Sequence, residues 1–125
     1  MSNINTINNT SNSGISRIQE AMSFVPIITL IILFINILVH VIIFLFSINL
    51  SNVAISYQLV IVKGEFYRIV SAAFVHAGIM HIFMNMSSLI QLGVTLERQM
   101  GSLQYFIFTA WSVILVGGLY LVLCW

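Results

Sequence analysis

Three long stretches without a charged residue dominate this chain of 125 residues: 21–62, 69–96 and 99–125. All seven charged residues lie outside them, in three short clusters: Arg17, Glu20, Lys63, Glu65, Arg68, Glu97 and Arg98. Each stretch is long enough to cross a bilayer, because a transmembrane helix needs about 20 predominantly apolar residues. The pattern therefore predicts an integral, multi-pass membrane protein of the all-α class.

The overall charge excludes two broad classes of protein. Charged residues make up 6% of the chain, whereas soluble domains carry about 25%. The net charge is +1 and no basic patch is present, so nucleic acid is not an expected partner. The single cysteine, Cys124, has no partner for an internal disulfide and no metal-ligand spacing around it. We expect no metal and no cofactor, and the lipid bilayer as the first partner.

The chain divides into a polar tail and a membrane domain. Residues 1–22 are rich in Asn, Ser and Thr and predict a disordered N-terminal tail. Residues 23–125 are expected to form a partial membrane domain with spans of about 24–48, 77–96 and 103–125. Ser23 is a candidate N-cap of the first span, and Pro26 falls in its first turn.

The polar residues of the first span, and the alternating residues that follow it, each allow two interpretations. Asn36 and His40 are one helical turn apart and share a face. They are either an interhelical hydrogen-bonding pair used for packing or part of a proton relay or substrate-facing surface. In residues 49–68, apolar side chains alternate with smaller or more polar ones, which suits a strand or a segment in the membrane interface.

The second span carries most of the polar residues. Small and polar side chains recur at spacings of three, four and three residues and form one stripe: Gly78, His81, Asn85 and Ser88. Such a stripe must face other helices or a water-filled cavity rather than lipid. The span is expected to close at Glu97 and Arg98, with Gly101 as the left-handed residue after the helix.

The candidate chemistry lies in the spacing His76-x4-His81-x3-Asn85. His81 and Asn85 lie on one helical face, so both can donate hydrogen bonds to one developing oxyanion. His76 is about 140° round the helix and joins them only if the helix bends or starts there. A metal site is weaker, because Asn is a poor zinc ligand and no Cys or carboxylate accompanies it. A buried hydrogen-bond network that holds helices together is the alternative.

From Tyr67 to Gly101 the chain resembles the rhomboid family of intramembrane serine proteases. Ten residues stand in order at positions of the family pattern: Arg68, Ser71, Phe74, His76, His81, Asn85, Gly93, Leu96, Glu97 and Gly101. The resemblance implies a bundle of six or more transmembrane helices. It implies a serine nucleophile in a Gly-x-Ser-x-Gly motif on the fourth helix and a histidine base on the sixth.

The same resemblance implies roles for the matching residues. His81 and Asn85 would stabilise the oxyanion, and His76 would support the local fold. Arg68 would have a structural role in the first loop and Glu97 at the helix end, whereas Gly93 and Gly101 are further positions of the structural motif. Transmembrane proteins would be the substrates or clients.

The chain departs from the family pattern in two ways. Tyr67 stands where the family has Trp, and Ser71 where it has Thr, which keeps an aromatic ring and a hydroxyl. No Gly-x-Ser-x-Gly occurs, and no histidine follows His81. We therefore expect the N-terminal half of a rhomboid-like endopeptidase, truncated after its third span. By itself it should be inactive and should need its missing C-terminal helices or a partner subunit.

Two other hypotheses remain open from the sequence. One is a catalytically inactive rhomboid-like protein that binds transmembrane helices in quality control or trafficking. The other is a small, unrelated multi-span subunit. Positive charges give no orientation, because two lie on each side of the membrane. The family's usual topology implies a cytosolic tail and a luminal or extracellular first loop. An endomembrane such as the ER or Golgi is the expected location.

Overall fold

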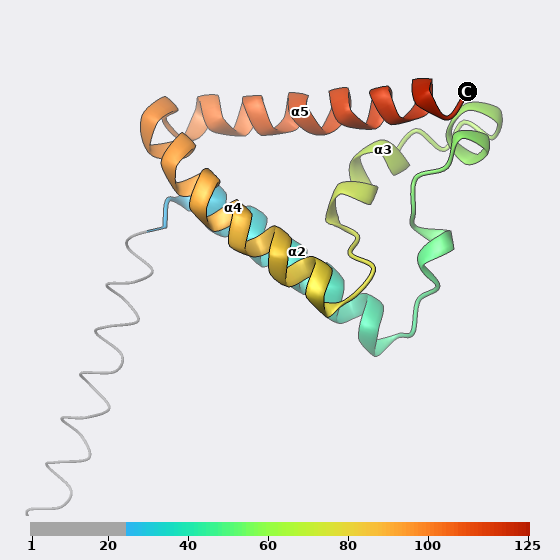
Figure 1. Ribbon diagram of the computed structural model, residues 1–125, viewed down its shortest axis with the longest axis horizontal. Coiled ribbons are helices and arrows are strands. Elements are labelled where there is room, and N and C mark those ends of the chain that lie inside the picture. The colour runs from blue at the N-terminus through green and yellow to red at the C-terminus, as the bar shows by residue number, and fades with distance from the viewer. Residues whose placement is uncertain (1–24) are drawn as a thin grey trace, which may run out of the picture.

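The computed structural model describes residues 25–125 (Figure 1). The expected tail, the Ser23 cap and the first residue of the expected first span lie outside the described residues. Three long helices, α2, α4 and α5, are joined by short helical turns. No strand occurs among residues 25–125, so the all-α prediction is confirmed.

Helix α2 covers Ile27–Leu45, inside the expected range of 24–48. Pro26 precedes it as the N-cap residue, with φ −61° and ψ 155°, and its carbonyl accepts from Leu30 N–H at 3.0 Å. Proline fits this position because its missing N–H has no helical partner to lose. The helix ends at Leu45, before Ser47 adopts a positive φ of 49°.

The connection between α2 and α4 consists of short helical turns, and the strand expected as one alternative for 49–68 is wrong. The turns are η1 (Leu50–Asn52), the π-helical η2 (Gln58–Val62), α3 (Arg68–Ser71) and η3 (Ala72–Phe74). A strand needs a neighbouring strand for its N–H and C=O groups, and the chain has no second alternating run to pair with it. Local turns satisfy these groups instead.

Helices α4 (Ile79–Met100) and α5 (Ser102–Leu123) are separated by one residue, Gly101. Its φ of 82° is the positive value expected there, and its N–H donates to the Glu97 carbonyl at 2.9 Å. The expected end of α4 at Glu97 and Arg98 is short of the observed end, because the helix continues until Gly101, the first residue to adopt a positive φ. At Gly101 the chain turns sharply and α5 diverges from α4 (Figure 1).

All three long helices have the length and apolar composition of membrane spans, at 19, 22 and 22 residues. Most of their large apolar side chains are exposed, which suits contact with lipid acyl chains. Helix α2 lies beside α4 in Figure 1, and it runs antiparallel, since the start of α2 contacts the end of α4. The turns α3 and η3 fill the angle between this pair and α5, because α3 packs on α5 and η3 on α2.

Candidate oxyanion site on α4

The carboxylate of Glu97 ties the start of α2 to the turn between α4 and α5. The side chain is 2% exposed. It accepts from the backbone N–H of Ile28 at 2.9 Å and of Thr29 at 2.7 Å, and from the Thr29 hydroxyl at 2.8 Å. The Ser102 hydroxyl also donates to it, at 2.7 Å. The first N–H groups of a helix have no partner within the helix, so Glu97 satisfies donors that α2 cannot satisfy itself.

Gly93 allows three helices to meet beside this anchor. A Cβ at this position would lie 2.8 Å from the Tyr105 hydroxyl oxygen and 2.9 Å from Cγ2 and Oγ1 of Thr29. Tyr105 is 3% exposed and Thr29 is fully buried. Only a glycine lets α4 approach α2 and α5 this closely, which explains why position 93 is a glycine.

Arg68 holds the connection between α2 and α4 together. Its guanidinium donates to the carbonyls of Asn52 at 2.8 Å and Ala54 at 3.1 Å, and it pairs with the Glu65 carboxylate. The hydrogen bond from Arg68 lowers the pKa of Glu65 below its ordinary value. Arg68 is 6% exposed, so this buried cation is neutralised by Glu65 and holds the two backbone carbonyls in place.

His76 reaches His81 because α4 begins between them. The helix starts at Ile79, and Gly78 before it is extended. The two imidazole rings meet edge to face, with centroids 5.3 Å apart and planes at 65°. His76 is 4% exposed, and burial lowers its pKa below the ordinary value. Within a continuous helix His76 would point away from the face that carries His81. It reaches His81 because the helix starts after it.

Hydrogen bonds define where each of these two rings carries its proton. Nδ1 of His76 lies 3.2 Å from the Phe74 carbonyl oxygen, which can only accept, so the proton of the neutral ring is on Nδ1. Nδ1 of His81 accepts from the Ala77 N–H at 3.4 Å. A ring nitrogen that accepts has no proton, so neutral His81 carries its proton on Nε2. His81 is therefore a hydrogen-bond donor through Nε2.

Asn85 follows His81 one turn later on α4, and both side chains are exposed. Asn85 lines a groove of about 370 Å³ between α4 and α5, together with His76, Ser88 and Gly93. His81 lines a separate hollow of about 210 Å³ that faces residues 50–55 and Ala72. The structure thus places the two candidate donors on neighbouring turns of one helix, without enclosing them in a single cavity.

The expected hydrogen-bonding pair of Asn36 and His40 is not formed. The Asn36 amide donates to the Ile32 carbonyl of its own helix at 2.7 Å. Nδ1 of His40 is buried, and no residue in the described part of the chain gives it a hydrogen bond. No interhelical hydrogen bond of Asn36 or His40 is present among residues 25–125, so the packing role stays a prediction for this pair.

Sequence reasoning missed the partners of Glu97. Its hydroxyl donors are Thr29 at the start of α2 and Ser102 at the start of α5. A carboxylate inside an apolar span needs donors, so two hydroxyl residues at helix ends were the signal. Among residues 25–125, no three His, Cys, Asp or Glu side chains are arranged to hold a metal ion.

Two comparisons with known proteins match the chain to rhomboid proteins. Residues 63–124, about half of the chain, match the rhomboid domain. Over 48 residues the chain is 40% identical to "RHOMBOID-like protein 6, mitochondrial" of Arabidopsis thaliana. That match covers 38% of this chain and 16% of the Arabidopsis protein, so it spans a minor part of the relative's length. No solved structure matches the chain.

Proposed function

Because this chain belongs to the rhomboid family, we propose that it contributes the oxyanion-stabilising part of an intramembrane serine endopeptidase. In the proposed reaction a serine hydroxyl attacks a peptide carbonyl of a transmembrane substrate, and a histidine takes the serine proton. Negative charge develops on the carbonyl oxygen. His81 and Asn85 donate hydrogen bonds to that oxygen, and the intermediate collapses when the leaving amine receives the proton.

The observation that carries this proposal is the hydrogen bond from the Ala77 N–H to Nδ1 of His81. The Ala77 N–H occupies Nδ1, so Nε2–H is left as the donor of the neutral ring. Asn85, one turn away, has an amide that donates regardless of pH. Two donors on adjacent turns of a helix that is anchored at its far end by Glu97 suit a preorganised oxyanion site. The serine and the base would come from elsewhere in the complete enzyme.

The test is proteolysis of a transmembrane substrate by the full-length protein in liposomes. Removing one oxyanion donor typically lowers kcat about 100-fold to 1,000-fold. We expect that loss in His81→Ala and in Asn85→Ala. Ser87→Ala is the matched control, because the Ser87 hydroxyl bonds to the Phe83 carbonyl of its own helix at 2.8 Å and Ser87 does not line the groove. Equal rates for the wild type and both variants would contradict the proposal.

A second candidate function is the binding of transmembrane helices without catalysis. It is favoured by the groove between α4 and α5, whose walls include small side chains that permit close helix approach: Ala73, Ser88, Gly93, Thr109 and Ser112. Under this alternative, crosslinking of a client helix would be lost when Ser112→Phe fills the groove. His81→Ala would leave that crosslinking unchanged, and the wild type would cleave no substrate.

The cellular location of the protein can be narrowed to a membrane. The three apolar helices and the family support a membrane protein. The Arabidopsis relative carries "mitochondrial" in its name, whereas the sequence suggested an endomembrane. We propose an organelle membrane, and a fluorescent fusion of the full-length protein compared with mitochondrial and ER markers would distinguish these locations.

A further inference from the structure

Two neighbouring glycines on α5, Gly117 and Gly118, have very different surroundings. A Cβ at Gly118 would meet nothing within 4 Å. A Cβ at Gly117 would lie 2.7 Å from Cγ2 of Ile69, whereas carbon atoms in contact lie about 3.5–4.0 Å apart. Ile69 belongs to α3, which packs on α5. The Ile69 side chain is therefore seated directly on the α5 backbone, and Gly117 has no place in the family pattern described above.

A second contact holds α3 from another direction. Arg68, the residue before Ile69, donates from its guanidinium to the carbonyls of Asn52 and Ala54. Consecutive residues of a helix point about 100° apart, so these neighbouring side chains reach different parts of the molecule. Arg68 holds α3 to the connection that follows α2, and Ile69 holds it to the membrane span α5.

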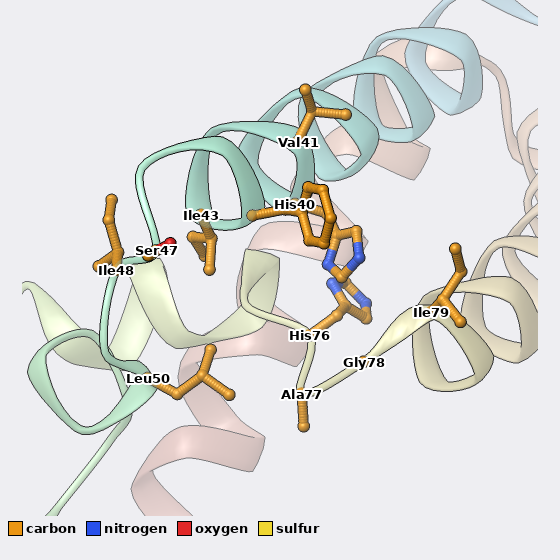
Figure 2. Close-up of a pocket in the computed structure, with 11 residues that line it drawn as sticks. His40, Val41, Ile43, Ser47, Ile48, Leu50, His76, Ala77, Gly78 and Ile79 are labelled. Carbon is orange, nitrogen blue, oxygen red and sulfur yellow. The ribbon is translucent and has the colours of Figure 1, made fainter.

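A short run of helical turns leads from α3 to His76. The turn η3 follows α3 without a gap and packs on α2. The Phe74 carbonyl at its end accepts from Nδ1 of His76 at 3.2 Å. His76 lines a cavity of about 750 Å³ together with His40 of α2, and its ring points toward α2 (Figure 2). Because no flexible stretch separates Ile69 from Phe74, a displacement of α3 is passed on to the His76 ring.

Both groups that orient the His81 ring lie at the end of this run. The His76 ring meets the His81 ring edge to face, with centroids 5.3 Å apart. The next residue, Ala77, donates its N–H to Nδ1 of His81 at 3.4 Å. A displacement of the His76 ring and the Ala77 N–H therefore changes the orientation of His81 and the tautomer that it prefers.

We propose that Gly117 is a positioning residue. The close seat that it gives Ile69 places α3 and η3 where His76 and Ala77 orient the His81 ring. Donors to a developing charge must be in place before the reaction, and a misplacement of about 1 Å can cost about 100-fold in rate. The effect on catalysis rests on the proposed oxyanion function, whereas the coupling of Gly117 to the His81 ring does not.

Variants at two positions separate this coupling from general damage to the fold. Gly117→Ala places a methyl group against Cγ2 of Ile69, so α3 must move away from α5. Gly118→Ala adds the same group in open space and is the matched control. Adding Ile69→Ala to Gly117→Ala should relieve the clash, because the next nearest atoms, O and Cβ of Ile69, lie at 3.5 and 3.6 Å. Ile69→Val keeps Cγ2 and should give no relief.

Nitrogen-15 NMR of the histidine-labelled full-length protein in lipid nanodiscs measures the coupling. The wild type and Gly118→Ala should show His81 with its proton on Nε2, assigned with His81→Gln. Gly117→Ala should show mixed tautomers at His81, and the double variant with Ile69→Ala should restore the wild-type signal. Ile69→Ala alone loosens the same contact without a clash and should also give mixed tautomers, which keeps the test open if Gly117→Ala fails to fold.

A merely structural role for Gly117 would lower the thermal midpoint without changing the His81 signal of the folded protein. An unchanged His81 signal in folded Gly117→Ala or in Ile69→Ala would therefore overturn the positioning role. Mixed tautomers in Gly117→Ala that persist in the double variant would overturn it as well, because the contact with Ile69 would then not be their cause.

Kinetics supply the second measurement. Gly117→Ala should lower kcat for the transmembrane substrate by about 10-fold to 100-fold with little change in KM, whereas Gly118→Ala should keep the wild-type rate. The double variant with Ile69→Ala should recover most of the loss. An altered His81 signal in a protein whose wild type cleaves nothing would support the coupling and reject the proposed protease function. An unaltered signal in an active enzyme that needs His81 would do the reverse.

Discussion

The two ends of the α2–α4 pair differ in how completely their polar groups are hydrogen-bonded. At the anchor end, defined by Thr29, Gly93, Glu97, Ser102 and Tyr105, every donor around the carboxylate has an acceptor. At the histidine end, defined by His40, His76 and His81, one buried ring nitrogen has no hydrogen-bond partner among residues 25–125, and one ring is exposed. A satisfied network fixes geometry, whereas unsatisfied donors remain available for chemistry.

This difference shows how a helix can be rigid and reactive at once. The anchor end holds α2, α4 and α5 in one arrangement, and α4 carries that arrangement over its 22 residues to the histidine end. Donors that must meet a developing charge work best when they need no rearrangement. We therefore expect substitutions at the anchor end to affect mainly stability, and those at the histidine end to affect mainly function and pH dependence.

The largest expected effect comes from removing the anchor carboxylate. Glu97→Ala leaves two N–H groups and two hydroxyls around a buried site without their acceptor. We expect a loss of about 2–4 kcal/mol in the free energy of unfolding, measured by denaturant titration in micelles with circular dichroism. Glu97→Gln keeps one acceptor and should lose about half of that.

Thr95→Ala is the matched control for the anchor on the same helix. The Thr95 side chain is exposed, and its hydroxyl bonds only to the Gln91 carbonyl one turn back, at 2.9 Å. Its unfolding free energy should stay within about 0.5 kcal/mol of the wild type. A Glu97→Ala variant as stable as Thr95→Ala would mean that the anchor does not hold the helices together.

A methyl group at Gly93 is the next largest expected perturbation. Its Cβ would lie 2.8 Å from the Tyr105 hydroxyl and 2.9 Å from Thr29, so these side chains or the helices that carry them must shift. Such overpacking costs about 1–3 kcal/mol, which the same denaturant titration would detect. Gly118→Ala is the control, because nothing lies within 4 Å of a Cβ there. Similar stability in both variants would show that the close approach at Gly93 is not needed.

A smaller, pH-dependent effect is expected at the histidine end. Burial lowers the pKa of His76, so the unfolded chain binds a proton before the folded one does. Stability from neutral His76 is therefore complete above the ordinary histidine pKa of about 6.5 and falls as the pH drops below it. Thermal denaturation at pH 5 and pH 7.5 should show a lower midpoint at pH 5. His76→Gln should reduce this difference, and an unchanged difference would assign it to another group.

The smallest expected effect concerns the ion pair of Glu65 and Arg68. Because the hydrogen bond from Arg68 lowers the pKa of Glu65, the contribution of this carboxylate is present above its ordinary pKa and is lost as the pH falls below it. Denaturation midpoints between pH 3 and pH 5 should decline less in Glu65→Gln than in the wild type. Equal slopes in both proteins would show that this ion pair adds nothing measurable to stability.

Much of the fold was readable from the sequence because its signals are local. The lack of charges over 21–62, 69–96 and 99–125 predicted the three spans. The positive φ of Gly101 was predictable because glycine is the residue type that adopts such values freely. The strand considered for 49–68 failed because alternation describes one segment, whereas pairing requires a second. The starts of the three helices differ from the expected ones by three, two and one residues, and the observed start of α4 at Ile79 leaves His76 free to reach His81.

The candidate site was partly readable for the same reason. The i, i+4 spacing of His81 and Asn85 places them on neighbouring turns of any helix. The donors to Glu97 come from residues 28 and 29, nearly 70 positions away along the chain. The approach of Ile69 to Gly117 depends likewise on the packing of α3 on α5. Neither contact leaves a periodic signal in the sequence.

By itself the sequence determined that this protein lies in a membrane, crosses it as helices and carries a rhomboid-like motif on its second span. Hydrophobic length and residue spacing act through the local chain, so no folding partner is needed to read them. Only the tertiary structure decided that Glu97 caps α2, that Gly93 lies where three helices meet, and that three histidines share one end. Those facts depend on contacts between distant segments, where hydrogen-bond donors find acceptors only after the helices have packed.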